Sequence, residues 1–381
     1  MQTIERLHVF YHDRKVGTMM LYQKHLAAFE YDHEWLTDGF PVSPFSLPLE
    51  KKVFLPKIDP FEGLFGVFAD SLPDGWGRLL VDRLMLRNHI NPHETGSLDR
   101  LSIVGNSGMG ALTYEPDTQL DSPQPQMDLD QIASECRRIL HSDYSDNLDE
   151  LFRLGGSSGG SRPKILTNIG GEDWIIKFPS TQDRGQIGLQ EYEYSLCAKE
   201  CGIEMAETRL FPSGLCDSYF GTKRFDRIQK KDGTTERIHM ISVSALLETS
   251  HRIPNLDYDI LLKLTLELTK DFKEVEKLFR LMCFNVFAHN RDDHSKNFSF
   301  LYREDEERFV LSPAYDLTYS YSLGGEHATT VHGNGQNPGM EDILASADTI
   351  GIDRRKAKQI AESIQECVMN HLSSYLNNPD E

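Results

Sequence analysis

The sequence lacks the features that would place the protein in a membrane or directly on nucleic acid. Forty basic side chains stand against 59 acidic ones, a formal net charge of −19 over 381 residues. Because phosphate binding requires a basic face, this balance argues against DNA wrapped on the protein's own surface, although it leaves room for a local basic patch or a DNA-binding partner. No apolar run approaches the roughly 20 residues that cross a bilayer, and the first residues carry charges in place of a signal peptide's apolar core. We therefore expect a cytoplasmic protein without a membrane segment.

Cysteine is also scarce, with six residues and no pair at the CxxC spacing of zinc ribbons and thiol oxidoreductases. Cys197 and Cys201 are four residues apart in a predicted helix, so they share one of its faces. We interpret this pair as small apolar side chains that pack in the core, with a metal or disulfide role as the less favoured alternative.

Hydrophobic patterns divide the chain into a strand-rich first part and a helical last part, which predicts the α+β class. Alternating segments such as RLHVFY predict strands, whereas DFKEVEKLFRLMCFNVFAHN carries apolar residues at helical spacing. A polar, proline-containing stretch after residue 115 is the best linker candidate. The expected parts are a β-rich N-terminal subdomain (1–115), a linker and helix (116–150), a sheet with a Gly/Ser loop (151–245) and a helical lobe (246–381).

The most informative stretch is FNVFAHNRDDHSKNFSFL, residues 284–301, which reads as a helix end, a polar loop and a strand. Asp292 and Asn297 lie five residues apart in this loop, and Asp316 follows another apolar strand. This spacing is typical of protein kinases, in which the first Asp orients the acceptor hydroxyl while the Asn and the later Asp hold Mg²⁺. Asp293 competes for the catalytic role, but only Asp292 has the required spacing. A two-lobed, protein-kinase-like fold is therefore expected.

Two histidines flank the loop and allow another interpretation. His289 precedes it and is expected to brace it, and His294 is interpreted as a structural hydrogen-bonding group, with proton transfer or phosphate contact as alternatives. Together with the aspartates they also resemble the ligands of a metal hydrolase. That interpretation is the less favoured one, because neither HxH nor HExxH spacing is present and the upstream glycine loop would have no role.

Glycine-rich segments upstream offer partners for a nucleotide. The segment GGSSGGS at 155–161 precedes two predicted strands, the second of which carries Lys177 among apolar neighbours. Glycines let backbone N–H groups approach phosphates, and the lysine ammonium is suited to neutralise them. The GNSGMG segment at 105–110 is interpreted as a structural turn, because no Lys-Ser/Thr pair follows it.

In combination, these motifs resemble the HipA family of bacterial serine/threonine kinases, the toxins of HipBA-type toxin–antitoxin modules. The N-terminal resemblance is carried by FEYDHEWL (29–36), SPFSLPLE (43–50), FADSLPDGWGR (68–78) and LSIVGNSGMGALTYEPD (101–117). The kinase-core resemblance is carried by GGSSGGSRPK (155–164), WIIKFP (174–179), QEYEYSLCAKECG (190–202), KRFDR (223–227), DDHSKNF (292–298) and AYDL (314–317). The resemblance spans nearly the whole chain.

The resemblance implies a role for each matching residue, with Mg²⁺ and ATP as cofactors. Asp292 matches the catalytic residue, and Asn297 and Asp316 match the metal ligands. The residues implied to contact the nucleotide are Gly159, Gly160, Ser161, Arg162, Pro163, Lys164, Lys177, Lys223, Arg224, Phe225, His294, Ser295, Lys296, Asn297, Tyr315 and Asp316. Ser157 matches an autophosphorylated serine whose phosphate would occupy the place of ATP's phosphates.

The resemblance also implies partners. These are a HipB-like helix-turn-helix antitoxin, through which the acidic chain would reach DNA indirectly, and a protein substrate such as an aminoacyl-tRNA synthetase. Two alternatives stay open from the residues alone: a repressor-binding module with weak kinase activity, and a small-molecule phosphotransferase.

Overall fold

A computed structural model describes residues 3–118, 127–141, 147–156, 159–181, 183, 186–321 and 323–377. Two compact units are present: unit 1 comprises Met1–Gly188 and Leu210–Thr249, and unit 2 comprises Leu189–Arg209 and Ser250–Glu381. Sheets and helices occur in both units, which confirms the predicted α+β class. The boundaries expected at residues 115, 150 and 245 stay predictions. Within these described ranges, no helix is long and apolar enough to cross a membrane.

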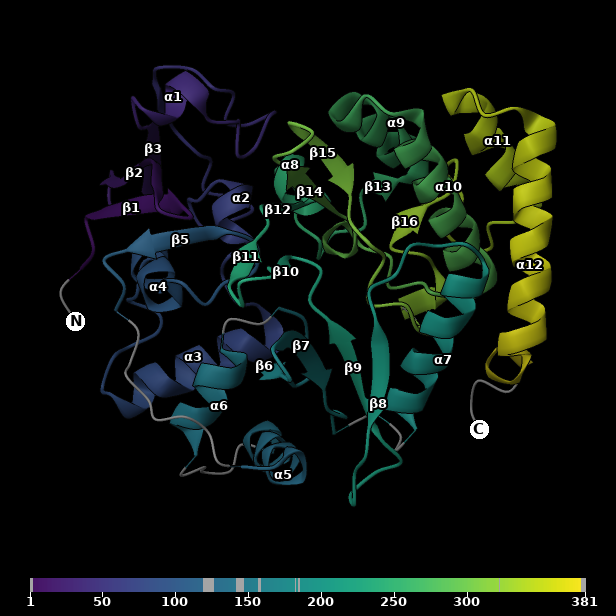
Figure 1. Ribbon diagram of the computed structural model, residues 1–381, viewed down its shortest axis with the longest axis horizontal. Helices are drawn as coiled ribbons and strands as arrows, with labels where there is room; N and C mark the ends of the chain where they lie inside the picture. Colours follow the sequence, from purple (N-terminus) through teal and green to yellow (C-terminus); the bar gives the residue numbers. More distant parts are fainter. Residues whose placement is uncertain are drawn as a thin grey trace. The chain divides into compact units, whose positions relative to one another are not determined.

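The first sheet of unit 1 has five antiparallel strands in the order β4-β3-β2-β1-β5 (Figure 1). Along β1, alternate residues Leu7, Val9 and Tyr11 are buried, as the period of a strand with one covered face requires. The strands are β1 (Arg6–Tyr11), β2 (Arg14–Tyr22), β3 (Leu26–Tyr31), β4 (Val53–Phe54) and β5 (Leu112–Glu115), and the accompanying helices are α1 (Trp35–Asp38), α2 (Gly66–Ala69) and α4 (Ser97–Val104).

The second sheet of unit 1 carries the glycine-loop segment and has the order β6-β7-β9-β8. Helices α3 and α6 pack against each other, and α6 also packs on β6. Trp76 of α3 and Trp174 of β7 belong to the same buried cluster, which fixes the helices on the sheet. The elements are α3 (Gly75–Arg87), α5 (Leu129–Leu140), α6 (Leu148–Gly155), β6 (Lys164–Ile169), β7 (Glu172–Lys177), β8 (Thr208–Phe211) and β9 (Tyr219–Lys223), followed by β10 (Arg227–Gln229), β11 (Thr235–Arg237), β12 (Met240–Ser242) and α8 (Val243–Leu246).

The GNSGMG turn in unit 1 is bound by arginine side chains. Arg237 donates to the carbonyl oxygens of Gly108 (3.1 Å) and Gly110 (3.0 Å), and Arg227 also donates to that of Gly110 (2.9 Å). The Gly110 N–H in turn donates to the buried carboxylate of Asp226 at 2.7 Å. These contacts within the protein support the interpretation of this segment as a structural turn.

Unit 2 is mainly helical, with α10 at its centre. Its buried residues include Val275, Leu278, Phe279 and Met282, and α10 packs against α9, α11 and α12 (Figure 1). The Asp271 side chain accepts a hydrogen bond from the Lys273 N–H and so caps the start of α10. The elements are α7 (Ile187–Glu200), β13 (Leu256–Asp257), α9 (Tyr258–Thr269), α10 (Phe272–Phe287), η1 (Ser295–Asn297), β14 (Ser299–Arg303), β15 (Arg308–Leu311), η2 (Leu323–Gly325), β16 (Thr329–Thr330), α11 (Met340–Ile350) and α12 (Arg354–Asn377).

Candidate active site

The polar loop after α10 begins with a sharp change of direction. Ala288 caps the helix, and the next residue, His289, has a φ of 50°, in the left-handed region that non-glycine residues seldom adopt. Its carbonyl oxygen accepts from the Ser320 N–H at 3.1 Å, and the Arg291 carbonyl oxygen accepts from the Ala328 N–H at 3.0 Å. The loop is therefore tied to the segment that follows β15 through the backbone carbonyl oxygens of His289 and Arg291.

A chain of buried hydrogen bonds fixes the conformation of the loop. Asp293 is fully buried, and its carboxylate accepts from the Tyr258 hydroxyl (2.9 Å), from His327 Nδ1 (3.0 Å) and from the Thr329 N–H (3.1 Å). Two asparagines continue the series of hydrogen bonds: the Asn285 amide of α10 donates to the Tyr258 hydroxyl, and the Asn290 amide donates to Asn285 Oδ1. We call the whole set the loop-bracing network: Asn285, Asn290, Tyr258, Asp293, His327 and Thr329.

Asp293 is thereby committed to structure, which supports the choice of Asp292 as the reactive group. The Asp292 side chain is 64% exposed, and His294 Nε2 lies 3.8 Å from Asp292 Oδ1. Two adjacent aspartates thus point into opposite environments, one into the core and one into solvent. Sequence spacing had distinguished them, and burial now gives the physical reason.

Asn297 is held in an orientation that suits a metal ligand. Its Nδ2 donates a hydrogen bond to the Asp292 backbone carbonyl oxygen at 2.7 Å. This bond spans the loop and occupies the nitrogen of the side-chain amide. The side-chain oxygen of Asn297 is then the atom that can bind a cation. Oxygen is the ligand that Mg²⁺ prefers.

Asp316 lies in a segment that contacts the same loop. The hydroxyl of the preceding residue, Tyr315, donates to the Lys296 carbonyl oxygen at 2.6 Å and lies 2.6 Å from the Ser299 hydroxyl. Asp316 itself has a φ of 55°, a left-handed conformation that costs energy in a residue other than glycine. The structure therefore brings Asp292, Asn297 and Asp316 into adjoining segments of unit 2.

Ser295–Asn297, at the end of this loop, form the short helix η1. His294 caps it by accepting from the Lys296 N–H at 3.3 Å, which agrees with the structural role expected for this histidine. The Ser295 hydroxyl is buried and has no hydrogen-bond partner among the described residues. Burial, with a smaller contribution from Arg291, lowers the pKa of His289, so that ring is neutral near pH 7.

In unit 1, two lysines concentrate positive charge at the start of the second sheet. Lys164 and Lys177 are cross-strand partners on β6 and β7, both are buried, and Lys177 Nζ lies 5.6 Å from the centre of the Phe220 ring. Like charges directly opposite each other on neighbouring strands are unfavourable, and burial adds a desolvation cost. Two ammonium groups on neighbouring strands attract an anion such as a phosphate, so the pair is compatible with the predicted nucleotide contact.

The glycine loop docks on the start of α3 through a contact that the sequence did not reveal. The Gly160 N–H donates to the Asp74 carboxylate, and the Trp76 N–H donates to the Gly160 carbonyl oxygen at 2.9 Å. Gly160 has a φ of 88°, and a Cβ there would lie 2.7 Å from Lys164 Nζ, so only glycine fits without displacing that ammonium group. Asp74 occupies the N-cap position of α3, as its place before the helix predicts, but it uses its carboxylate to position this loop.

The remaining predicted nucleotide contacts in unit 1 make ion pairs within the protein. Arg162 binds both oxygens of Asp183 (3.1 and 3.3 Å), and Lys223 pairs with Glu172. Pro163 is buried and accepts from the Phe178 N–H at 2.8 Å, whereas Gly159 and Ser161 are exposed.

The Arg224 side chain is buried and donates to both carboxylate oxygens of Asp226. The backbone N–H of Arg224 donates to the Asp173 carbonyl oxygen at 2.8 Å. Burial alone would raise the pKa of Asp226, but Arg224 and Arg227 hold it well below its usual range. The Arg224 side chain is thus part of the fold, and Phe225 is half-buried beside it.

The structure places the expected site residues in two groups. Asp292, His294, Ser295, Lys296, Asn297, Tyr315 and Asp316 belong to unit 2, and the glycine-loop residues, Lys177 and the segment 223–225 belong to unit 1. Convergence of the two groups on one nucleotide stays a prediction. Ser157, the expected autophosphorylation site, lies outside the described residues. His327 and Thr329, which hold Asp293, were missed because they lie in a Gly-rich stretch, 326–340, that carries no spacing signal.

The fold and the unit 2 constellation together define an α+β protein with a catalytic-loop-like segment. Two family models match the chain: "HipA N-terminal domain" over residues 7–115 and "HipA-like C-terminal domain" over residues 156–372. The chain belongs to the HipA family. Its fold is similar to that of HipA from Shewanella oneidensis MR-1, solved with HipB and its operator DNA, with a TM-score of 0.72 at 17% identity, covering 97% of this chain and 91% of that one. The predicted HipA-type fold is confirmed.

Two proteins of Sinorhizobium fredii are similar in sequence. The one named "Putative kinase Y4dM" is 24% identical over 345 residues, covering 86% of this chain and 81% of its own length. The one named "Putative kinase Y4mE" is 28% identical over 353 residues, covering 83% and 77% respectively.

Proposed function

We propose that the protein is a Mg-ATP-dependent serine/threonine protein kinase of the HipA type. The observation that carries this proposal is the pairing of an exposed Asp292 with Asn297, which spans the loop through its own amide, while Asp293 is buried as a brace. Kinase-named relatives and membership of the HipA family support the same reaction class.

Each residue has a distinct task in this reaction. Asp292 accepts the proton of the serine or threonine hydroxyl and orients its oxygen toward the γ-phosphorus. As the new oxygen–phosphorus bond forms, the bond from that phosphorus to the β–γ bridging oxygen breaks and ADP leaves. Lys177 and Lys164 neutralise nucleotide phosphates, and the exposed Gly159 contributes its backbone N–H.

The residues present fit a magnesium ion. Asn297 and Asp316 supply hard oxygen ligands, and the Asn297 amide is already turned by its hydrogen bond to the loop backbone. When bound, Mg²⁺ neutralises charge on the nucleotide phosphates.

The test uses full-length, dephosphorylated protein incubated with Mg-ATP and analysed by intact mass. We expect a gain of one or more phosphoryl groups, reduced by about a hundredfold or more in rate for Asp292→Asn. Asp305→Asn, an exposed acid in the β14–β15 turn, is the matched control and should behave as the parent protein does. Equal labelling of all three proteins would refute the role of Asp292. Absence of labelling in a protein that binds ATP would count against the function itself.

The substrate and partners follow from the family rather than from the site. We propose Ser157 as the autophosphorylated residue and a translation component, such as an aminoacyl-tRNA synthetase, as the target. Because the Shewanella protein was solved with HipB and operator DNA, we also propose a HipB-like antitoxin as the partner that brings this acidic chain to DNA. Labelled ATP in whole-cell lysate, compared between the parent and Asp292→Asn, would identify the target band.

A further inference from the structure

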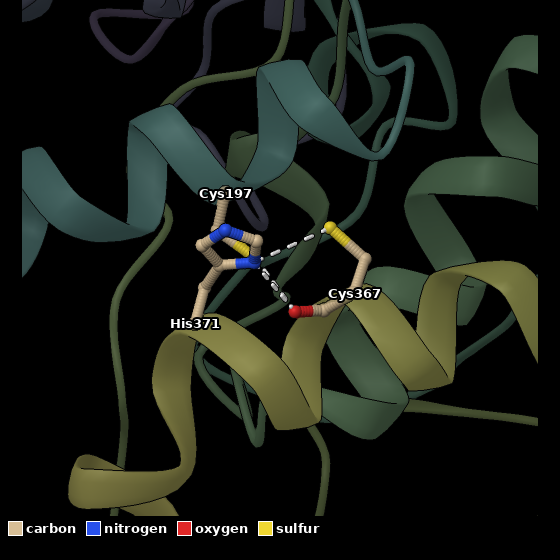
Figure 2. A group of neighbouring side chains, drawn as sticks. All are labelled: Cys197, Cys367 and His371. Atoms are coloured by element: carbon tan, nitrogen blue, oxygen red, sulfur yellow. Dashed lines mark hydrogen bonds between the residues drawn. The ribbon is translucent and has the colours of Figure 1, made fainter.

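Two thiols and an imidazole of unit 2, those of Cys197, Cys367 and His371, gather where α7 and α12 lie side by side (Figure 2). Cys197 lies in the last turn of α7, Cys201 directly follows that helix, and Cys367 and His371 are one turn apart on α12. Both pairs have the i, i+4 spacing that places side chains on one face of a helical turn. Both sequence patterns, CxxxC and CxxxH, differ from the turn-based CxxC of zinc ribbons.

The separations fit a single tetrahedral ion. The ligand atoms of Cys197, Cys367 and His371 all lie within 4.8 Å of one another, and Cys367 Sγ is 3.8 Å from His371 Nδ1. Bonds of about 2.3 Å to sulfur and about 2.1 Å to nitrogen place two ligands of a tetrahedral zinc ion about 3.6 Å apart. Small side-chain rotations therefore suffice to close the site. Cys201 lies outside this group of three, but its thiol neighbours those of Cys197 and Cys367, and we assign it as the fourth ligand after a rotation of its side chain.

We propose that Cys197, Cys201, Cys367 and His371 bind one Zn²⁺ ion, which fastens the C-terminal helix α12 to α7. The ligand set is Cys₃His, one of the sets that structural zinc sites use. Because thiolates and imidazole are soft or borderline donors, the site excludes Mg²⁺ and is chemically distinct from the oxygen ligands of the candidate active site.

The surroundings of the cluster suit a cation. His371 Nε2 lies 3.1 Å from Glu200 Oε2, and a carboxylate on the second ring nitrogen is the usual outer contact of a zinc-bound histidine. His371 Nδ1 lies 3.8 Å from Cys367 Sγ and 2.9 Å from the Cys367 backbone carbonyl oxygen, so binding would exchange the carbonyl contact for the ion. Cys201 follows the last residue of α7, where the partial negative charge of a helix C-terminus favours a positive ion. Cys197 and Cys201 are buried, whereas His371 is partly exposed and gives the ion a path of entry.

The helices already meet through weaker contacts on the same side. The Tyr375 hydroxyl donates to Glu193, and the Tyr375 ring centre lies 5.9 Å from that of Tyr194. A metal ion would turn this packing into a cross-link between two helices that are 170 residues apart at Cys197 and Cys367. The interpretation of Cys197 and Cys201 as simple packing residues is thereby replaced by our proposal.

The experiment measures the metal content of the full-length protein, purified under reducing conditions without a metal-affinity tag. We expect about one zinc ion per chain, retained through dialysis with a dissociation constant below about 1 µM. Cys367→Ser and His371→Ala should each weaken binding at least tenfold. Cys216→Ser, which alters a half-exposed cysteine of unit 1, should bind zinc as the parent does.

A second measurement keeps the test valid if a variant fails to fold. Metal-free parent protein titrated with Co²⁺ should develop the intense visible absorption of tetrahedral thiolate coordination. Failure of the parent protein to retain zinc, together with a weak octahedral cobalt spectrum, would overturn the proposal. So would loss of two of these thiols to a disulfide in protein purified without reductant, since that outcome would identify a redox pair instead. None of these readouts depends on kinase activity.

Discussion

The adjacent aspartates of the loop provide the sharpest test, because one substitution should cost stability and the other activity. In Asp293→Asn the side chain keeps its shape but has one acceptor oxygen in place of two. Oδ2 now accepts from Tyr258 and His327 and Oδ1 from the Thr329 N–H, so either orientation of the amide loses at least one bond to a charged group.

The magnitude follows from two contributions. A hydrogen bond to a charged group contributes about 1.5–3 kcal/mol, and a buried donor left facing another donor costs about 1–3 kcal/mol. We expect Asp293→Asn to destabilise the loop and its surroundings by about 3 kcal/mol. Asp292→Asn, at a side chain that is 64% exposed, should change stability by no more than about 0.5 kcal/mol.

The assay separates the two units. All three tryptophans, Trp35, Trp76 and Trp174, belong to unit 1, so fluorescence during urea unfolding reports that unit. Hydrogen exchange of peptides covering residues 285–299 reports the loop, where a loss of about 3 kcal/mol lowers protection about a hundredfold. Unchanged protection in Asp293→Asn, or an equal loss in Asp292→Asn, would refute the distinction between a structural and a reactive aspartate.

Three further predictions concern unit 1. Lys177→Met should weaken Mg-ATP binding tenfold to a hundredfold in calorimetry, because one charge-assisted contact to phosphate contributes about 1.5–3 kcal/mol, whereas the exposed Lys231→Met should bind as the parent does. Asp74→Ala removes the acceptor of the Gly160 N–H, so the KM for ATP should rise about threefold to tenfold with the fold intact; an unchanged KM would show that this contact does not order the loop. Burial lowers the pKa of His239 from 6.5 to about 4, so its neutral form stabilises unit 1 above pH 6.5, and about 3 kcal/mol is lost as the pH falls from 6.5 toward 4. His239→Gln, which can still donate to the Val42 carbonyl oxygen, should flatten this part of the stability–pH curve measured by urea unfolding; a slope like that of the parent would contradict the assignment.

The sequence by itself determined those features that depend on residues close together along the chain. Asp292 and Asn297 are five residues apart in one loop, where the Asn297 amide donates a hydrogen bond to the Asp292 backbone carbonyl oxygen. The strands and helices are likewise indicated by local patterns of apolar residues. The sequence also correctly indicated the α+β class and the HipA family, because their motifs are short and occur in a fixed order.

Only the tertiary structure decided which groups are buried and which distant groups meet. Asp293 is structural because Tyr258, 35 residues away, and His327, 34 residues away, enclose it. Asp74 positions Gly160 from 86 residues away, and Cys197 meets Cys367 across 170. Hydrogen bonding and metal binding depend on distance in space, and tertiary packing within each unit sets those distances, so they could not be read from spacing along the chain.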